Sequence, residues 1–419
     1  MNLPAGLVRI LGVLANRNYA IWIGGNSVSL TAMWAQRIGI GWLAWELTQS
    51  VFWVGIIAAA DLAPGLLVTP FAGIVGDRRD RLTLVRQAQG LSAVISAALA
   101  AMVLLDAADI YLLVALATAQ GIAMGFKQPS RMALVRSLVV DKDLSTAIAL
   151  NAVLFNLARF VGPLVAGGLI LSQGLGSVFV FALLGSIFFV VTLKFVRPLR
   201  REPAPASSSS PADAPLKGTA YAYAFSHPGI GPLLVLQFAN GAFIRGFTEL
   251  LPAYSDTVLG RGAEGLAIMS ASIGVGAIFS GLWLAQREGV KGLTRHIFVS
   301  QAIASVLVVV LAGTATLLMA SLLVGLIGFM LATTSIAALT LIQRATPEDR
   351  LARVMAILGV ILHASPAAGA LVMGAAADLV GFTIPLIAGG ALCLAAVAYV
   401  LRREGVVRAS LEAADVKGS

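Results

Sequence analysis

The chain has 419 residues, of which 58% are hydrophobic and 12% are charged. Soluble domains are about 45–50% apolar and about 25% charged, so this composition excludes an ordinary soluble protein. The formal net charge is +9. The positions of the basic residues, given below, indicate orientation in a membrane and contact with anionic lipid headgroups, and not binding of nucleic acid.

Twelve long apolar segments follow one another along the chain. A membrane span needs about 20 apolar residues, and residues 297–343 contain no charged residue over a length that holds two spans. We therefore predict an all-α membrane protein of twelve transmembrane helices in two six-helix pseudo-repeats. The predicted spans are 19–45, 52–76, 83–105, 110–133, 145–171, 177–196, 229–254, 263–285, 296–313, 316–342, 352–377 and 383–401.

A linker separates the two sets of six spans. Residues 203–215 read PAPASSSSPADAP, a polar stretch rich in Pro and Ser that has nothing to bury and is predicted to be flexible. The predicted organisation is an N-terminal half at 1–196, a cytoplasmic linker at 197–228, a C-terminal half at 229–401 and a cytoplasmic tail at 402–419.

The basic residues are concentrated in every second predicted loop. The N-terminus, the even-numbered loops with their flanking helix ends and the C-terminus carry 25 of the 29 Lys and Arg residues, and Lys127 and Arg131 are among them. The odd-numbered loops hold one basic residue, Arg261. Because cytoplasmic loops carry an excess of Lys and Arg, we predict a multi-pass protein of the cell inner membrane with both termini in the cytoplasm.

A motif of one glycine, one aspartate and two arginines follows the second predicted span. Its residues are Gly73, Asp77, Arg78 and Arg81. The glycine permits tight helix crossing, the aspartate can pair with an arginine or a helix N-terminus, and the arginines can bind acidic partners or lipid phosphates. The motif resembles the loop 2–3 signature of the major facilitator superfamily. That resemblance implies a cytoplasmic gate that latches the two halves in the outward-facing state; the alternative is a positive-inside loop with no further role.

The fifth predicted span carries a second motif, Gly162, Pro163 and Gly167, which is similar to the antiporter motif of the same superfamily with Ala166 in place of one glycine. Pro163 removes one backbone hydrogen bond in a helix that has no water to replace it. The glycines permit a bend and close packing. We expect this antiporter-like motif to be a mechanical element and not a ligand site.

The resemblance covers about residues 16–402, and segments 16–19, 128–134 and 149–159 are similar to the enterobactin-exporter and macrolide-efflux branch of the superfamily. It implies a secondary active transporter, a proton-coupled exporter of a small amphipathic molecule, drug-like or siderophore-like, that works by alternating access. Lipid or metabolite uptake or flipping by the same fold, and a non-transporting membrane sensor, are the alternatives. The implied partners are a small-molecule substrate, H+ and membrane lipids, with no nucleic acid and a monomeric chain.

Sequence motifs of catalysis are absent. The chain has no Walker-A phosphate loop, no metal-ligand cluster and no G-x-S-x-G element. Its one cysteine, Cys393, lies in an apolar run and allows no disulfide framework. We predict that the chain is not an enzyme and needs no cofactor or metal.

Ionisable residues inside the predicted spans are the main candidates for function, because insertion scales put the cost of each near the helix centre at roughly 2.5–3.5 kcal/mol. We assign them, together with two polar residues, to a substrate or proton pathway. The full set is Asp61, Arg37, Arg159, Asn156, Arg245, Glu249, His363 and Asn26.

Two pairs of these residues each have two alternative roles. A desolvated Asp61 near the membrane midplane can carry a proton, or it can form a static ion pair with Arg37, and the two roles are compatible. Arg245 and Glu249 share a helix face at i,i+4. They either neutralise each other to lower the cost of insertion or form a pair for which substrate or proton competes.

The remaining candidates also have alternatives. Arg159, with Asn156 one turn earlier, either lines a cavity and favours anionic or carbonyl-rich substrates or makes a structural ion pair. His363 is either a proton group or a packed polar residue beside Pro366. Asn26 lines the cavity or forms hydrogen bonds across helices.

Overall fold

The computed structural model describes residues 11–78, 81–197, 219–287 and 289–412. Within these ranges the regular secondary structure is helical, without a strand. This confirms the predicted all-α class, and its physical cause is that a helix satisfies its own backbone hydrogen bonds where no water is present.

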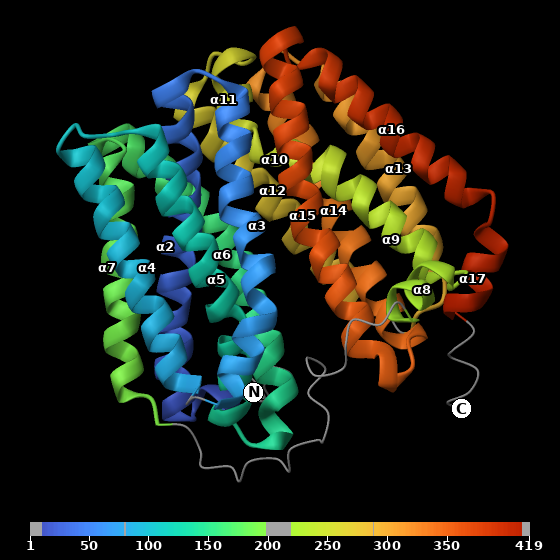
Figure 1. Ribbon diagram of the computed structural model, residues 1–419, viewed down its shortest axis with the longest axis horizontal. Coiled ribbons are helices and arrows are strands. Elements are labelled where there is room, and N and C mark those ends of the chain that lie inside the picture. The colour runs from blue at the N-terminus through green and yellow to red at the C-terminus, as the bar shows by residue number, and fades with distance from the viewer. Residues whose placement is uncertain (1–10, 79–80, 198–218, 288, 413–419) are drawn as a thin grey trace, which may run out of the picture. The chain divides into compact units, whose positions relative to one another are not determined.

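All twelve predicted spans coincide with helices (Figure 1). The first six are α2 (Arg17–Thr48), α3 (Val51–Arg78), α4 (Arg81–Leu104), α5 (Ile110–Leu138), α6 (Leu144–Gln173) and α7 (Gly176–Phe195). After the seventh span, described below, come α12 (Gly262–Ala285), α13 (Leu293–Leu311), α14 (Leu317–Ala345), α15 (Glu348–Val380) and α16 (Thr383–Leu401).

Eleven helical segments of the described chain are long and apolar enough to cross a membrane. The helix in the first predicted span, α2, is not among these eleven although it is 32 residues long. Polar side chains interrupt its apolar sequence, and two of them, Asn26 and Gln36, are buried. The lower hydropathy of α2 is therefore due in part to polar side chains that lie in the protein interior.

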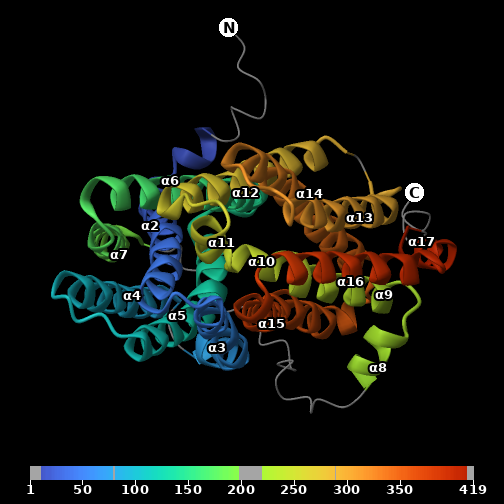
Figure 2. The same ribbon diagram turned by 90° about the horizontal axis from the view of Figure 1, so that it is seen from above.

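The seventh predicted span is a succession of four short helices and not one α-helix. They are α9 (Ile230–Ala239), the π-helix η2 (Asn240–Arg245), α10 (Gly246–Glu249) and α11 (Leu251–Thr257). Leu250 leaves helical geometry just before Pro252. The helices α9 and η2 lie beside α15 and α16, α10 lies beside α15, and α11 lies beside α12 (Figure 2).

Close packing against α15 accompanies the π-helix. A Cβ atom added to Gly241 would collide with the side chain of Ser365, and one added to Gly369 would collide with the backbone of Ala242. Small residues allow such close approach of helices in membranes.

The chain divides into two compact units. Unit 1 comprises residues 1–43 and 63–208, and unit 2 comprises residues 44–62 and 209–419. The end of α2 and the first part of α3 thus belong to unit 2. Two side chains of unit 2 explain this grouping: Trp45 Nε1 donates to Asp256 Oδ2 at 2.8 Å, and Asp378 accepts hydrogen bonds from residues at the start of α3.

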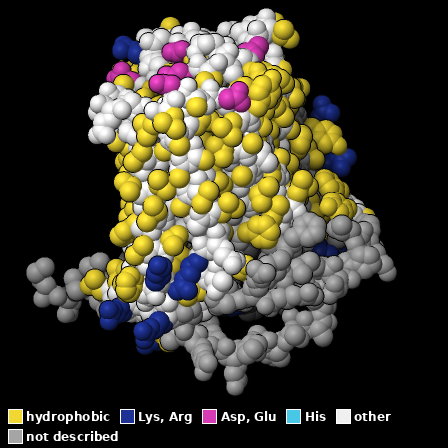
Figure 3. Space-filling view, turned by 60° about the vertical axis from the view of Figure 1, so that its left-hand side comes forward, with side chains coloured by type: hydrophobic (Ala, Val, Ile, Leu, Met, Phe, Trp, Pro, Cys, Tyr) yellow, Lys and Arg dark blue, Asp and Glu magenta, His cyan; other side chains and the backbone are white. Residues whose placement is uncertain are grey.

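One face of the molecule is covered by a broad band of hydrophobic side chains, with Asp and Glu side chains at one end and several Lys and Arg side chains at the other (Figure 3). Exposed apolar residues on α4 and α7 include Val94, Leu184 and Phe188. In water such a band would be costly to expose, so it is the surface expected to face lipid.

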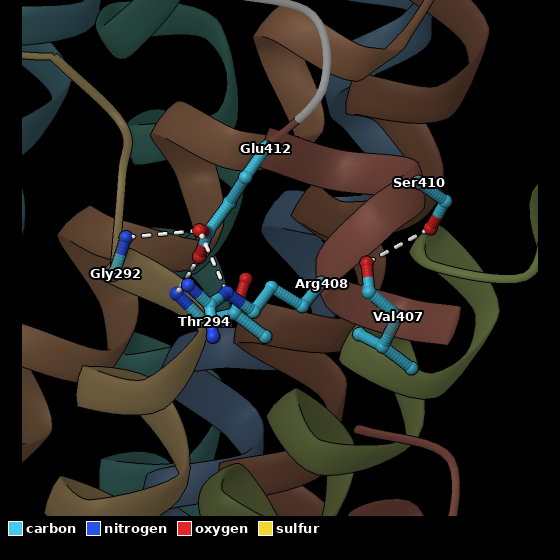
Figure 4. Close-up of polar contacts among 6 residues, drawn as sticks. All are labelled: Gly292, Thr294, Val407, Arg408, Ser410 and Glu412. Carbon is cyan, nitrogen blue, oxygen red and sulfur yellow. Dashed lines mark hydrogen bonds and ion pairs between the residues drawn. The ribbon is translucent and has the colours of Figure 1, made fainter. Parts of the chain in front are cut away.

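Two short helices lie in the ranges predicted as linker and tail. They are α8 (Thr219–Ser226) and α17 (Glu404–Glu412). The helix α17 buries Val407 and Leu411, and its Glu412 accepts hydrogen bonds from backbone N–H groups at the start of α13 (Figure 4). The Pro/Ser-rich stretch 203–215 lies outside the described residues.

Candidate functional site

An aromatic ring with two arginines close to it is the first notable feature of unit 1. Trp34 lies on α2, and the Cζ atoms of Arg37 and Arg159 are 5.6 Å and 5.5 Å from the centroid of its ring. Phe155 meets the same ring edge-on, with centroids 5.9 Å apart. Cation–π attraction favours both arginine positions. The structure therefore brings together two predicted site residues, Arg37 and Arg159, which are both half-buried.

The antiporter-like motif lies on the same helix as Arg159, and its first glycine packs against Trp34. Gly162, Pro163 and Gly167 are buried in α6, which continues as an α-helix through the proline. A Cβ atom on Gly162 would lie 2.5 Å from the Cβ atom of Trp34. The glycine thus sets how closely α6 approaches α2, and with it the separation of Arg159 from Trp34.

A network of amides and one guanidinium links α2, α5 and α6. Arg131 Nη2 donates to Asn26 Oδ1, and Asn26 Nδ2 donates to Asn151 Oδ1 at 3.1 Å. Asn26 is fully buried. Asn26 was predicted either to line a cavity or to form hydrogen bonds across helices, and the structure shows such hydrogen bonds.

Two basic residues assigned to the fourth loop are inside unit 1. Lys127 is 1% exposed and Arg131 is 6% exposed. Both were counted with the helix ends that flank the fourth loop, and the structure places their side chains in the interior of unit 1, on α5. The signal that could have identified them is their position inside the predicted span 110–133.

The other ionisable candidates belong to unit 2. Asp61 is half-buried on α3 in unit 2, whereas Arg37 belongs to unit 1, and their pairing stays a prediction. Arg245 ends η2 and Glu249 ends α10, and both are half-buried. Their roles stay predictions too.

Two polar candidates have partners in their own helices. His363 is exposed, and its Nδ1 atom lies 2.9 Å from the carbonyl oxygen of Gly359. Asn156 Nδ2 donates to the carbonyl oxygen of Ala152 at 3.0 Å.

The predicted cytoplasmic gate spans the junction of two helices. Gly73, Asp77 and Arg78 lie in the last turns of α3, and Arg81 begins α4. Their side chains lie outside the described residues, and the gate stays a prediction. Among the residues that the structure does describe, no group of three or more His, Cys, Asp or Glu side chains could hold a metal ion.

Long apolar helices that hold polar and basic side chains in their interior define this chain as a multi-pass membrane protein with a polar interior. The sequence profile of the transmembrane secretion effectors matches residues 13–417. The chain therefore belongs to this family of the major facilitator superfamily, as its motifs predict. Members of the family are transporters and not enzymes.

Individual relatives agree with this assignment. A stretch of 135 residues is 27% identical to the Staphyloferrin A transporter of Staphylococcus aureus, and it covers 32% of this chain and 34% of the relative. The chain thus matches about a third of the length of that relative.

Solved structures share the fold. A bacterial homologue of the human lysosomal transporter Spinster, in an inward-facing and unoccupied conformation, has a TM-score of 0.65 at 15% identity over 94% of this chain and 98% of its own. The nucleoside transporter NupG has a TM-score of 0.67 at 11% identity over 92% and 99%.

Proposed function

We propose that the chain is a proton-coupled exporter of a small amphipathic molecule, drug-like or siderophore-like, which works by alternating access of its two halves. We place it in the cell inner membrane as a monomer with both termini in the cytoplasm. The observation that carries the proposal is the pair of arginines that flank Trp34 in unit 1.

The Trp34 cluster favours a substrate that combines negative or carbonyl oxygen atoms with an apolar body. Guanidinium groups bind carboxylate and carbonyl oxygens through charge-assisted hydrogen bonds, and the rings of Trp34 and Phe155 offer apolar area. The similarity to the Staphyloferrin A transporter supports a siderophore-like substrate, although it covers only a third of each chain.

Proton coupling is assigned to carboxylates inside the spans. Asp61 on α3 and Glu249 at the end of α10 are half-buried, and a partly desolvated carboxylate can take up and release a proton during a transport cycle. The predicted gate of Gly73, Asp77, Arg78 and Arg81 would close the cytoplasmic side.

Substrate accumulation tests transport and coupling together. Cells that lack their own efflux systems are loaded with candidate substrates, and accumulation is measured with and without a protonophore. Expression of the chain should lower accumulation, and the protonophore should abolish the difference. Transport that persists without a proton gradient would contradict antiport, whereas raised accumulation on expression would indicate uptake.

Substitutions at Arg159 test substrate chemistry. Arg159→Ala should reduce transport of anionic substrates by about tenfold or more, because one hydrogen bond to a charged group contributes about 1.5–3 kcal/mol. Arg159→Lys should retain part of that activity, and neutral substrates should be less affected by either change. Equal losses for neutral and anionic substrates would exclude substrate binding by Arg159.

Asp61→Asn and Glu249→Gln separate the two carboxylates. The variant that loses accumulative transport but retains exchange of substrate down its gradient identifies the proton carrier. Undiminished proton-driven transport by both variants would remove them from the proton pathway.

A further inference from the structure

A small cavity lies inside unit 1 between α2, α4, α5 and α7. It has room for about one water molecule or an ion of similar size. Lys127 lines the cavity from α5, and no Asp or Glu lines it among the described residues. A buried basic side chain therefore faces a polar cavity whose described lining holds no carboxylate.

The ammonium group of Lys127 is incompletely satisfied by its protein partners. Its Nζ atom donates to Gln89 Oε1 at 3.2 Å and to Ser92 Oγ at 3.4 Å. An ammonium group has three N–H donors, so one donor has no acceptor among the described residues. Both partners are neutral, and Arg131 adds a second positive charge one helical turn further along α5. Buried charges without a counter-charge are costly.

The rest of the lining carries hydroxyl and amide groups that can donate hydrogen bonds to a ligand. Ser92 already accepts from Lys127, so its hydroxyl proton is available to a ligand. Ser29 and Ser186 also line the cavity. Neither hydroxyl group forms a hydrogen bond with a described residue. Gln120 Oε1 is buried without a partner. Because an amide can be turned to exchange its oxygen and nitrogen atoms, Gln120 can supply a further donor.

We propose that this cavity binds one monovalent anion of about the size of chloride. Such an ion would accept from Lys127 and from the serine hydroxyl groups, and it would supply the negative charge that the lining lacks. Polyatomic anions such as phosphate and substrate carboxylates are too large for a space of this volume. The ion would hold α2, α4, α5 and α7 together, and this role is independent of the transported substrate.

The first experiment measures thermal unfolding of the purified full-length protein in detergent at constant ionic strength. Gluconate is replaced stepwise by chloride, and in parallel by bromide. The unfolding midpoint of the wild-type protein should rise with chloride concentration and then saturate, because a ligand that binds only the folded state stabilises it. A water molecule as the only occupant would give no chloride-specific rise, and that result would overturn the proposal.

Variants locate the effect. Lys127→Gln should abolish the chloride-dependent rise, whereas Lys142→Gln, which removes an equal charge from an exposed site on the 3₁₀ helix Asp141–Asp143, should retain it. Ser29→Ala and Ser186→Ala should weaken apparent chloride affinity by about two- to tenfold, the effect of one lost hydrogen bond. An unchanged chloride response in Lys127→Gln would exclude this cavity as the site.

Bromide also gives a test that needs no variant. Crystals grown or soaked in bromide should show an anomalous peak beside Lys127 Nζ, between α2, α4, α5 and α7. Bromide peaks confined to the protein surface, with none in this cavity, would contradict the proposal even if Lys127→Gln failed to fold.

Discussion

His227 accepts two hydrogen bonds just before α9. Its Nδ1 atom accepts from the backbone N–H groups of Gly229 and Ile230 at 3.2 Å each. Burial lowers the pKa of His227 below its ordinary value of 6.5, and a protonated ring could not accept these bonds. Since the folded-state pKa is below that of the unfolded chain, the stabilisation is fully present above pH 6.5. It is lost as the pH falls through the folded-state pKa.

We expect His227→Asn to remove this pH dependence while keeping an oxygen acceptor for the same N–H groups. Between about pH 8 and about pH 5, the wild-type protein should lose about 0.5 kcal/mol relative to the variant. This is the low end of capping energies, because the ring is partly exposed. Thermal unfolding of both proteins across that pH range measures the difference. Parallel profiles for the two proteins would show that His227 does not act as a cap.

Gly162 lies where α6 packs closely against α2. A Cβ atom at this position would lie 2.5 Å from Trp34 Cβ and 3.0 Å from the carbonyl oxygen of Thr31. Gly162→Ala should therefore destabilise the protein by about 1–3 kcal/mol, as overpacking does. It should also reduce transport, because α6 carries Arg159.

Gly168 provides the matched control on the same helix. A Cβ atom there would have no neighbour within 4 Å, so Gly168→Ala should be neutral or stabilising by up to about 1 kcal/mol through helix propensity. Thermal unfolding in detergent and accumulation assays compare the two variants. Similar effects of both substitutions would mean that the packing of α6 against Trp34 is unimportant.

The C-terminal helix α17 caps another helix of unit 2. Glu412 accepts from Gly292 N at 2.9 Å and from Thr294 N at 3.1 Å, at the first turn of α13, and Arg408 Nε lies 3.4 Å from its carboxylate (Figure 4). A carboxylate is favoured at a helix N-terminus. Burial alone would raise the pKa of Glu412, but the two N–H donors and Arg408 bring it below its ordinary value of 4.5.

Removal of this carboxylate should loosen α17. We expect Glu412→Ala to destabilise the protein by about 0.5–2 kcal/mol, the usual effect of a lost cap, and to increase amide hydrogen exchange in α17 and at the start of α13. The stabilisation by Glu412 should be present above pH 4.5 and disappear as the pH falls through its lowered pKa. Glu404→Ala, at the first residue of the same helix, is the control. Unchanged exchange at the start of α13 in Glu412→Ala would contradict the capping role.

Most helices of this protein were predictable because length and hydrophobicity define membrane spans, and α2 was predictable although its sequence is less apolar. The seventh span shows where this reasoning ends. Pro252 signals an interruption, but the π-helix at 240–245 coincides with the packing of Gly241 and Gly369 at α15. Contacts between residues so far apart in the chain leave no local periodicity in the sequence.

The candidate site was predictable only in part, because it too depends on contacts between residues far apart in the chain. The cost of burying charge singles out Arg37 and Arg159, but the ring that both contact, Trp34, carries no charge and gives no such signal. Lys127 was missed because a basic residue near a predicted helix end is usually cytoplasmic. Its position inside unit 1 depends on how far α5 extends and on which neighbours surround it.

At the level of the whole molecule, the linker after six predicted spans predicts two halves of six helices, and the compact units add a short segment of the first half to unit 2. Residues 44–62 are grouped with unit 2 although they precede most of unit 1 in the sequence. Ser50 Oγ donates to Asp378 Oδ2 at 2.6 Å, and the N–H groups of Val51 and Phe52 donate to the same carboxylate at 2.7 Å and 3.0 Å. Asp378 on α15 is thus the N-terminal cap of α3.

We expect Asp378→Ala to release the start of α3 from α15 and to destabilise unit 2 by about 1–3 kcal/mol, since it removes a helix cap that makes three hydrogen bonds. Amide hydrogen exchange should rise at Val51 and Phe52 and also along the facing turn of α15. Asp109→Ala is the matched control, because Asp109 caps its own helix α5 through Leu112 N at 2.9 Å. That substitution should raise exchange only at the start of α5. If Asp378→Ala affects α3 alone, the cap is local, and the grouping of residues 44–62 with unit 2 depends on Trp45 and Asp256 instead.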